Sequence, residues 1–474
     1  MSSVIWWVRR DLRLTDNPAL QAALASKQAV IPAFTLDHKL IESPNASEVR
    51  LGFLWGGLKQ LDQDLGARGS RLIIRRGLPD QALKELMAET GAQKIFAEAD
   101  FSPYARQRDE QVSRQLPLDL VGGCSISHPE AIRKPDGQPY VVYSPYMRAW
   151  KAIHKPEGWQ VYPAPTKILT PENLDSEPIP STPTLGINSF FEPGEAAARE
   201  RLAAFTGSSE PVIYRYAEDR NRMDLEGTAL ISPYLRFGML SAKEAALAAF
   251  QAQASAPGEE ERKGSETWLN ELIWREFYIS ILYHFPEVLK QSFRPELRHI
   301  PWRNDPEEYQ SWCQGLTGYP IVDAAMRQLK GTGWMHNRAR MIVASFLVKD
   351  LLIDWRWGER WFMQHLVDGD PAANNGGWQW TAGTGTDAAP YFRVFNPILQ
   401  SAKFDPQGKY IHQWVPEMEP IPSKYIHTPW ELPLDEQKKL GCIIGKDYPA
   451  PIVEHSFARQ RTLEAYKSAK KSEH

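Results

Sequence analysis

The chain has 474 residues, of which 42% are hydrophobic and 24% charged, and its formal net charge is -3. This length allows two or three domains with a large core, and the composition is that of globular proteins. The near balance of charge excludes a polycation, so any contact with nucleic acid must use a local basic surface.

Residues 1–123 alternate short apolar runs with amphipathic stretches. The runs that indicate buried strands are 4–8, 30–34, 72–74 and 94–97. The stretches that indicate helices between them are 47–64, 80–91 and 104–115. Strands that alternate with helices predict an α/β domain built on a parallel sheet. No Gly-x-Gly-x-x-Gly follows the first strand, so the sequence lacks a dinucleotide fingerprint there.

Residues 124–193 are rich in proline, which interrupts helices and sheet ladders. We therefore expect a long connector that lies over a surface. From residue 194 the pattern becomes helical, beginning with 195–205 and continuing through 241–254 and 268–285. The sequence thus predicts an all-α domain over 194–474.

Other features bear on the compartment. Cys124, Cys313 and Cys442 lie far apart and form no metal or redox motif, which fits a reducing cytosol. The N-terminus lacks a signal-peptide pattern, and no apolar run is long enough to cross a bilayer. We expect a cytoplasmic protein with no membrane partner and no bound metal.

Tryptophan is concentrated in the helical half, where 12 of the 17 lie after residue 267. They surround the stretch 368–380, Asp-Gly-Asp-Pro-Ala-Ala-Asn-Asn-Gly-Gly-Trp-Gln-Trp. A core built for stability alone favours aliphatic residues, because a buried indole N–H needs a hydrogen-bond partner. Carboxylates, amides and a glycine pair beside these indoles suggest that the backbone approaches a flat, redox-active or stacked ligand.

Helical spacing places Trp268, Glu271 and either Trp274 or Arg275 on one face. A carboxyl group between indoles would lose water, and its pKa would rise. The alternative is an ordinary amphipathic helix with Glu271 at the surface, where most carboxylates lie.

The stretch 333–341 carries a second polar group. Asn337 and Met341 share a face one turn apart, whereas Arg338 and Arg340 point elsewhere and could bind phosphate or carboxylate, or form surface pairs. His336 has no second histidine nearby, which favours a hydrogen-bonding role over metal ligation. For Asp368 and Asp370 the alternative to a binding role is a turn.

Several of these blocks resemble the photolyase/cryptochrome family, and within it the class I cyclobutane pyrimidine dimer photolyases. The blocks are 9–17, 268–278, 317–327, 333–338, 349–356 and 368–380. The resemblance spans nearly the whole chain. It implies an antenna-chromophore domain over 1–123, a linker over 124–193, and a helical domain over 194–474 that binds FAD.

The resemblance implies roles for individual residues around FAD. Asn374 matches the residue that faces flavin N5, and its amide cannot protonate the ring. Three tryptophans match the indoles that pass electrons from the surface to the flavin, although each could equally serve core packing; they are Trp302, Trp355 and Trp378. The positions expected to bind FAD are Tyr216, Thr228, Ser232, Arg340, Asp368, Asp370 and Asn374.

The resemblance also implies a DNA substrate. Glu271 would hydrogen-bond the dimer's carbonyl oxygens, and Trp274 and Trp380 would form apolar walls beside it. The remaining substrate positions are Asn337 and Met341 in the pocket, Arg220 at its rim, and Arg338, Arg393 and Lys403 at DNA phosphates.

Two departures from the family pattern concern ligands. Thr228-Ala229 replaces the usual Thr-Ser pair of the phosphate loop, which removes one hydroxyl donor. The folate-type antenna pattern has Asn-Glu where this chain has Tyr104-Ala105. Phe34, Arg50 and Asp100 instead look similar to a deazaflavin-type site, so a second chromophore of that type is favoured over folate.

The implied activity is light-dependent repair of cyclobutane pyrimidine dimers in UV-damaged DNA, by electron transfer from reduced FAD in a monomer. One alternative is a cryptochrome-type photoreceptor without repair activity. Another is a (6-4) photolyase, a branch that places a histidine pair in its pocket, whereas here His336 precedes Asn337.

Overall fold

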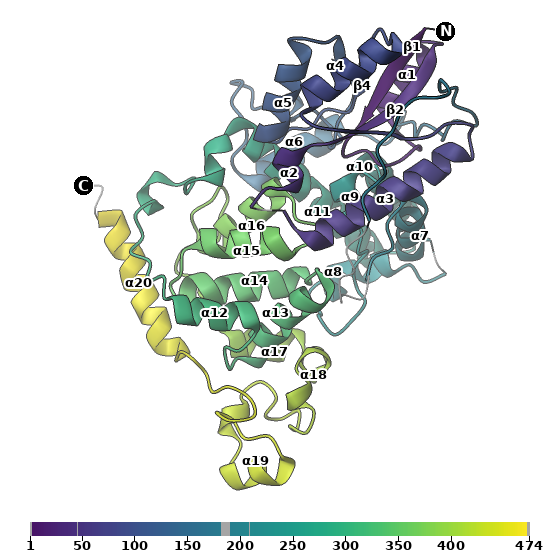
Figure 1. Cartoon of the computed structure of the whole chain (residues 1–474). Coiled ribbons are helices and arrows are strands. Elements are labelled where there is room, and N and C mark those ends of the chain that lie inside the picture. Colours follow the sequence, from purple (N-terminus) through teal and green to yellow (C-terminus); the bar gives the residue numbers. More distant parts are fainter. Residues whose placement is uncertain (1, 45, 182–189, 208, 472–474) are drawn as a thin grey trace.

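The computed structural model describes residues 2–44, 46–181, 190–207 and 209–471. It confirms an N-terminal α/β domain followed by a mostly helical domain. Figure 1 shows the strands and α1 to α5 at one end, and α18 and α19 at the other.

The sheet has five parallel strands in the order β3-β2-β1-β4-β5. The strands are β1 (Ser3–Val8), β2 (Ala29–Leu36), β3 (Ile73–Arg76), β4 (Ile95–Ala97) and β5 (Leu118–Leu120). All six residues of β1 are buried, because a central parallel strand is covered on both faces. The four strands expected from the sequence are confirmed, whereas the edge strand β5 was not predicted.

The helices of this domain are α1 (Pro18–Ala25), α2 (His38–Ile41), α3 (Glu48–Gly66), α4 (Pro79–Thr90) and α5 (Pro103–Ser113). The last three confirm the helices expected from the sequence. Ser47 and Ser102 cap α3 and α5 by accepting hydrogen bonds from backbone N–H groups. These two helix boundaries therefore follow local chemistry.

The proline-rich segment contains a helix that the sequence did not lead us to expect, α6 (Tyr143–Ile153). Its only proline, Pro145, lies in the first turn, where a missing N–H leaves no intrahelical hydrogen bond unmade. Tyr143, Tyr146 and Trp150 are buried, and α6 packs on α11 of the helical domain. The connector therefore contributes to the core.

The helical domain contains fourteen α-helices among the described residues. They are α7 (Glu195–Thr206), α8 (Tyr216–Asp219), α9 (Ser232–Phe237), α10 (Ala242–Ser255), α11 (Glu259–His284), α12 (Pro306–Gln314), α13 (Pro320–Thr332), α14 (Asn337–Ser345), α15 (Trp355–His365), α16 (Pro371–Ala382), α17 (Pro397–Phe404), α18 (Lys409–Trp414), α19 (Leu434–Leu440) and α20 (His455–Lys471). A π-helical turn, η5 (Phe346–Asp350), follows α14.

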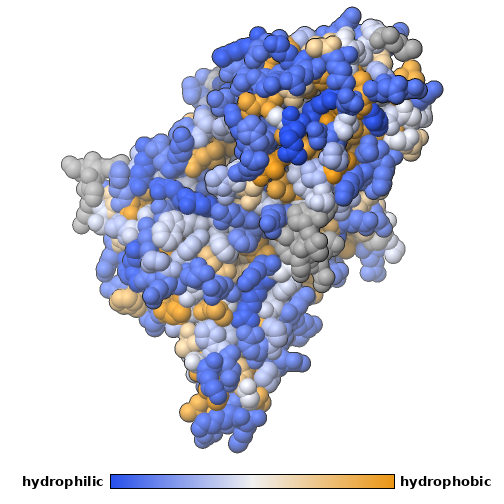
Figure 2. Space-filling view, viewed as in Figure 1, coloured by the Kyte–Doolittle hydropathy of each residue, from blue (hydrophilic) through white to orange (hydrophobic). Residues whose placement is uncertain are grey.

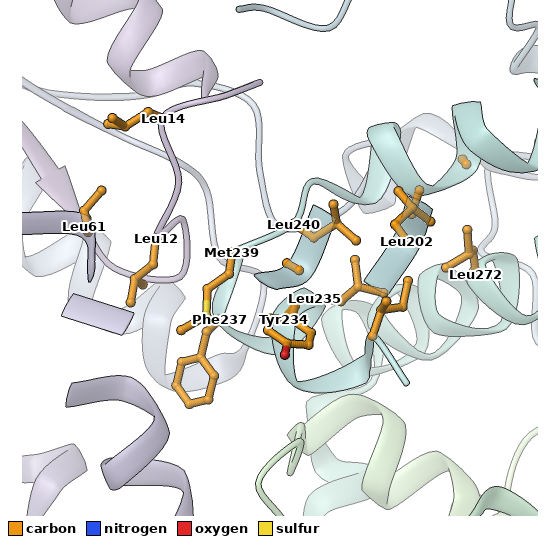
Figure 3. Packing of buried hydrophobic residues seen from close by; sticks show 14 of the residues in the cluster. Leu12, Leu14, Leu61, Leu202, Tyr234, Leu235, Phe237, Met239, Leu240 and Leu272 are labelled. Atoms are coloured by element: carbon orange, nitrogen blue, oxygen red, sulfur yellow. The ribbon is translucent and has the colours of Figure 1, made fainter. Parts of the chain in front are cut away.

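One hydrophobic cluster contains residues of both domains. Leu12, Leu14 and Leu61 of the α/β domain lie in the same cluster as Phe237 and Met239 of the helical domain (Figure 3). Gly238 has a φ of 62°, and a Cβ at this position would overlap the backbone of Arg10. A glycine is required where the two backbones approach this closely.

The C-terminal helix α20 closes the helical domain against η5. Thr462 donates a hydrogen bond to the backbone oxygen of Lys349, and His455 Nδ1 lies 2.6 Å from Asp350 Oδ1. Lys349 Nζ donates to the backbone oxygens of Ala382 at 3.1 Å and Tyr391 at 3.3 Å. Burial lowers the pKa of Lys349 to about 7.

None of the helices in the described ranges is both long and apolar enough to cross a membrane. Figure 2 shows that hydrophilic side chains cover most of the visible face, with apolar side chains in small separate patches.

Candidate functional site

Helix α16 lies in the middle of the helical domain, against α11, α14 and α15. Its Ala373 and Gly377, one turn apart on one face, are nevertheless exposed. This face of α16 is therefore accessible to solvent, although other helices pack on the rest of α16. This face belongs to the stretch whose composition predicted a ligand site.

The glycine pair of α16 serves two different purposes. A Cβ at Gly376 would overlap the ring of Tyr278 on α11, so this glycine permits close helix packing. A Cβ at Gly377 would meet no atom within 4 Å. The expectation that both glycines approach a ligand is therefore wrong for Gly376, whose neighbour is protein.

Asp368, just before α16, is bonded to residues of two other helices, α9 and α14. Its carboxylate accepts hydrogen bonds from Arg340 Nη2 at 2.8 and 3.1 Å and from Ser232 Oγ at 2.6 Å. Arg340, Asp368 and Ser232 are all positions that the resemblance assigns to FAD binding, and the structure brings the three together. Ser232 is the exposed first residue of α9.

Asp370 is engaged by protein on both oxygens. Oδ1 caps α16 by accepting from the N–H groups of Ala372 and Ala373, and Oδ2 accepts from Arg10 Nη2 at 2.7 Å. Burial alone would raise the pKa of Asp370, but Arg10 and Arg236 hold it at about 2. This carboxylate links the α/β domain to the N-terminus of α16.

Asn374 is oriented by α15, because its Nδ2 donates to the backbone oxygen of Glu359 at 3.0 Å. The next residue, Asn375, donates to Glu359 Oε1 at 3.0 Å. Burial raises the pKa of Glu359 to about 7. The sequence analysis missed Glu359, since nothing in its local pattern marks it as a neighbour of Asn374.

Tyr216 lies in α8, and Thr228 lies in the loop that leads from α8 to Ser232. Tyr216 begins α8 and is buried edge-on against Phe205, with ring centroids 5.9 Å apart. Ala229, which replaces the usual serine, is buried in the main hydrophobic cluster. A hydroxyl there would need a buried partner, so the methyl group suits its surroundings.

Glu271 forms an ion pair with Arg220. The pair is about one-third exposed on both sides. Burial raises the pKa of Glu271, and Arg220 opposes that rise. The carboxyl group of Glu271 is therefore partly desolvated and lies at the boundary between interior and solvent. This arrangement is intermediate between the two sequence interpretations, a carboxyl group enclosed by indoles and a surface carboxylate.

The polar residues at the start of α14 lie near the ion pair of Glu271 and Arg220. Asn337 Nδ2 is 4.0 Å from Met341 Sδ, which confirms that they share a face. Arg338 donates to Asn221 Oδ1 at 2.6 and 3.1 Å and stacks over the Phe404 ring at 4.4 Å. Burial, with Arg220 nearby, lowers the pKa of Arg338 to about 10. Asn221 was not identified from the sequence.

The other positions expected at the substrate are all at least partly accessible. Trp380 is half-buried, and Arg393 and Lys403 are exposed. Lys403 Nζ lies 5.4 Å from the centroid of the Phe404 ring, the ring that also contacts Arg338. Lys403 and Arg338 thus form a local basic edge in a chain with a negative net charge.

The three tryptophans expected to carry electrons gather at one hydrophobic cluster. Trp355 and Trp378 are buried members of it, and the half-buried Trp302 packs against it. A Cβ at Gly358 would overlap the Trp378 ring, so this glycine makes room for the indole between α15 and α16.

The three positions expected at a deazaflavin-type antenna have separate surroundings. Phe34 is buried in the core beside the sheet. Arg50 Nη1 donates to the backbone oxygens of Met363 and Leu366 in the helical domain. Asp100 pairs at 3.5 Å with Arg10, which also binds Asp370 of the helical domain. Arg50 and Asp100 therefore lie at the domain interface.

Two family descriptions match the chain, "DNA photolyase" over residues 4–167 and "FAD binding domain of DNA photolyase" over residues 268–468. A deoxyribodipyrimidine photo-lyase of Synechococcus sp. is 40% identical, over 98% of this chain and 97% of its own length. The chain belongs to the DNA photolyase family. The resemblance seen in the sequence motifs is confirmed at the level of the family.

Solved structures of this photolyase family agree with the fold. A bacterial class III photolyase from Agrobacterium tumefaciens has a TM-score of 0.91 and 37% identity, covering 99% of this chain and 98% of that one. A Synechocystis cryptochrome has a TM-score of 0.88 and 29% identity, covering 98% and 99%. An archaeal photolyase of Sulfolobus tokodaii, described with two FAD molecules, has a TM-score of 0.81 and 31% identity, covering 99% and 100%.

The residues present fit the FAD that this photolyase domain implies. The exposed face of α16 at Ala373 and Gly377 provides a surface without bulky side chains. Asn374 on the same helix supplies an amide, and Ser232 and Arg340, both bound to Asp368, supply hydroxyl and guanidinium groups. A buried polar ligand requires such hydrogen-bonding groups. In the described part of the chain, no group of three or more His, Cys, Asp or Glu residues is arranged to hold a metal ion.

Proposed function

We propose that this protein is a light-dependent deoxyribodipyrimidine photo-lyase that repairs cyclobutane pyrimidine dimers in DNA. The observation that carries the proposal is the ion pair of Glu271 with Arg220, half-buried three residues before Trp274 on the same helix. A partly desolvated carboxyl group beside an indole suits a pyrimidine dimer that has left the DNA stack, because the dimer has apolar faces and polar edges.

FAD, bound in reduced form, would supply the light-excited electron. The chain's own residues bind and orient the dimer. Trp274 and Trp380 offer apolar faces, Asn337 and Met341 line the pocket, and Glu271 hydrogen-bonds the dimer's edge. Arg338, Arg393 and Lys403 contact phosphates, so DNA binding weakens as the salt concentration rises.

We propose that Asn374 faces flavin N5, since its amide nitrogen is held by the Glu359 carbonyl. Tyr216, Thr228, Ser232, Arg340, Asp368 and Asp370 surround the rest of FAD. Asp370 acts from the end of α16, with its carboxylate held by Arg10.

A cryptochrome-type photoreceptor is the second candidate, because the Synechocystis cryptochrome shares the fold over nearly the whole chain. The (6-4) photolyase is less suited, since Asn337 stands beside His336 where that branch is expected to carry two histidines. Class I membership, action as a monomer and a cytoplasmic location are further parts of the proposal.

A second chromophore is suggested by the archaeal relative described with two FAD molecules. The surroundings of Arg50 and Asp100 at the domain interface give no preference between chromophore types. We keep the deazaflavin-type chromophore as the proposal. Absorption spectra of the purified protein after incubation with deazaflavin, folate or FAD would distinguish the three.

The decisive experiment illuminates the reduced protein with a dimer-containing oligonucleotide and measures dimer loss. The wild type should repair in light and not in darkness. Glu271→Ala should lower the repair yield about two- to tenfold, the effect of one lost hydrogen bond, with FAD content retained.

The matched control is Glu266→Ala, which removes another ion-paired glutamate of α11, the partner of Lys151. It should repair as the wild type does. Wild-type protein that binds FAD but leaves dimers intact in light would favour the photoreceptor. Equal repair by wild type and Glu271→Ala would refute the role of Glu271 alone.

A further inference from the structure

Trp274, a wall of the proposed substrate pocket, is stacked on one face by a residue of the connector. The rings of Trp274 and Tyr143 are 3.6 Å apart at the centroids and 6° from parallel. Tyr143 is buried, whereas Trp274 is only partly buried. One face of the indole is therefore covered by the tyrosine, and exposure remains elsewhere on the indole.

Two further aromatic rings of α11 also contact the Trp274 indole. Phe277 meets it edge-on at 5.6 Å, and Tyr278 lies at 5.5 Å, tilted by 33°. Tyr143 is itself fixed, because its hydroxyl donates to the backbone oxygen of Asn270 at 2.7 Å, one turn before Trp274. The stack thus joins α6 to the part of α11 that carries both Glu271 and Trp274.

The start of α6 is held by a residue from a third segment. The backbone N–H of Tyr143 donates to Asp387 Oδ2 at 3.0 Å. Asp387 belongs to the loop between α16 and α17 and has a φ of 43°, in the left-handed region. The same loop carries the exposed Arg393, one of the proposed phosphate contacts.

We propose that Tyr143 is a positioning residue for dimer recognition, which fixes the orientation of Trp274 by stacking, and that Asp387 links this stack to the DNA-facing loop. A side chain that is already immobile loses less conformational entropy when the substrate binds. Aromatic pairs of this kind also contribute more than their buried area alone. The inference rests on the proposed substrate pocket.

The test compares three variants of α6 by their affinity for dimer-containing and undamaged oligonucleotides. Tyr143→Leu keeps apolar volume but removes the stacked ring, and should weaken dimer binding about two- to tenfold. Affinity for undamaged DNA and FAD content should not change. Tyr143→Phe keeps the stack and should restore dimer affinity.

Tyr146→Leu is the control for general damage to the helix. Tyr146 is buried on the same helix, but its ring packs on Phe277 at 5.4 Å. This variant should keep the wild-type preference for dimers even if it melts earlier. Asp387→Ala, at the other end of the link, should weaken dimer affinity in the same direction as Tyr143→Leu.

The outcomes separate the two proposals. Wild-type protein with no preference for dimer-containing DNA would overturn the proposed function. A wild-type preference that Tyr143→Leu retains in full, or that Tyr146→Leu reduces equally, would overturn the role of Tyr143.

Discussion

Asp368 and Asp370 stand two positions apart, yet their surroundings differ. Asp368 binds Arg340 and Ser232, whereas Asp370 binds Arg10 and caps α16. The motif could predict that both carboxylates matter. It could not predict this division, because Arg10 is 360 positions away from Asp370 in the chain.

Trp378 offers a test of the electron route at the level of one residue. Trp378→Phe should stop or strongly slow the light-driven reduction of oxidised FAD, because phenylalanine is much harder to oxidise than tryptophan. The stability loss should be within about 0.5–3 kcal/mol, as for most core substitutions.

The measurement is the change in flavin absorbance under illumination with an external electron donor. Repair by chemically reduced protein should persist, which separates the electron route from the repair site. Trp312→Phe is the control, since Trp312 is a buried indole 6.2 Å from Trp378 that lies outside the proposed route. Normal photoreduction by Trp378→Phe would contradict the route.

Among the elements, those with strong local patterns were predictable. The apolar runs of β1 and β2 and the serine caps of α3 and α5 each depend on residues that are neighbours in sequence. Rules that use only such neighbours can therefore find them. The three-residue strand β5 escaped, because Leu-Asp-Leu carries little strand signal without its neighbour β4. Helix α6 was not predicted, because the many prolines of the surrounding segment indicated an irregular connector.

Helix α16 allows a comparison of two adjacent glycines. Gly376→Ala should destabilise the FAD-free protein by about 1–3 kcal/mol, because its methyl group would overlap Tyr278. Gly377→Ala has open space, so the FAD-free protein should be unchanged or up to about 1 kcal/mol more stable through helix propensity.

With FAD present, Gly377→Ala should be less stable than the wild type, because its methyl group enters the space assigned to the cofactor. Thermal melting of both variants, with and without FAD, measures these effects. Equal FAD-induced stabilisation of the wild type and Gly377→Ala would show that FAD does not occupy this face of α16.

At the scale of the whole molecule, Asp370 and Arg10 connect the domains. Asp370→Asn retains an oxygen that can cap α16, so the variant isolates the loss of charge. Arg10 would lose the charge of its closer partner but keep Asp100 at 3.5 Å, so the loss should be about 1–3 kcal/mol of unfolding free energy. Denaturant titration of the wild type and variant measures this difference.

The same pair predicts an acid dependence. The pKa of Asp370 is about 2 in the folded protein, below the ordinary aspartate value of 3.8 that applies to the unfolded chain. Between these values the unfolded chain binds more protons, so the contribution is complete above pH 3.8 and disappears as the pH falls towards 2. Asp370→Asn should have a shallower loss of stability in this window, and an unchanged acid limb would contradict the assignment.

The closure of η5 by α20 has a consequence for how this protein is made. The backbone oxygen of Lys349 and the carboxyl group of Asp350 bind Thr462 and His455, which lie 113 and 105 positions later in the chain. A ribosome delivers the chain from its N-terminus, so the sheet can form before α20 has been made, whereas η5 can be closed only after α20 has left the ribosome. During that interval the nascent chain holds the Asp350 carboxyl group at an unfinished interior, where His455 has yet to arrive.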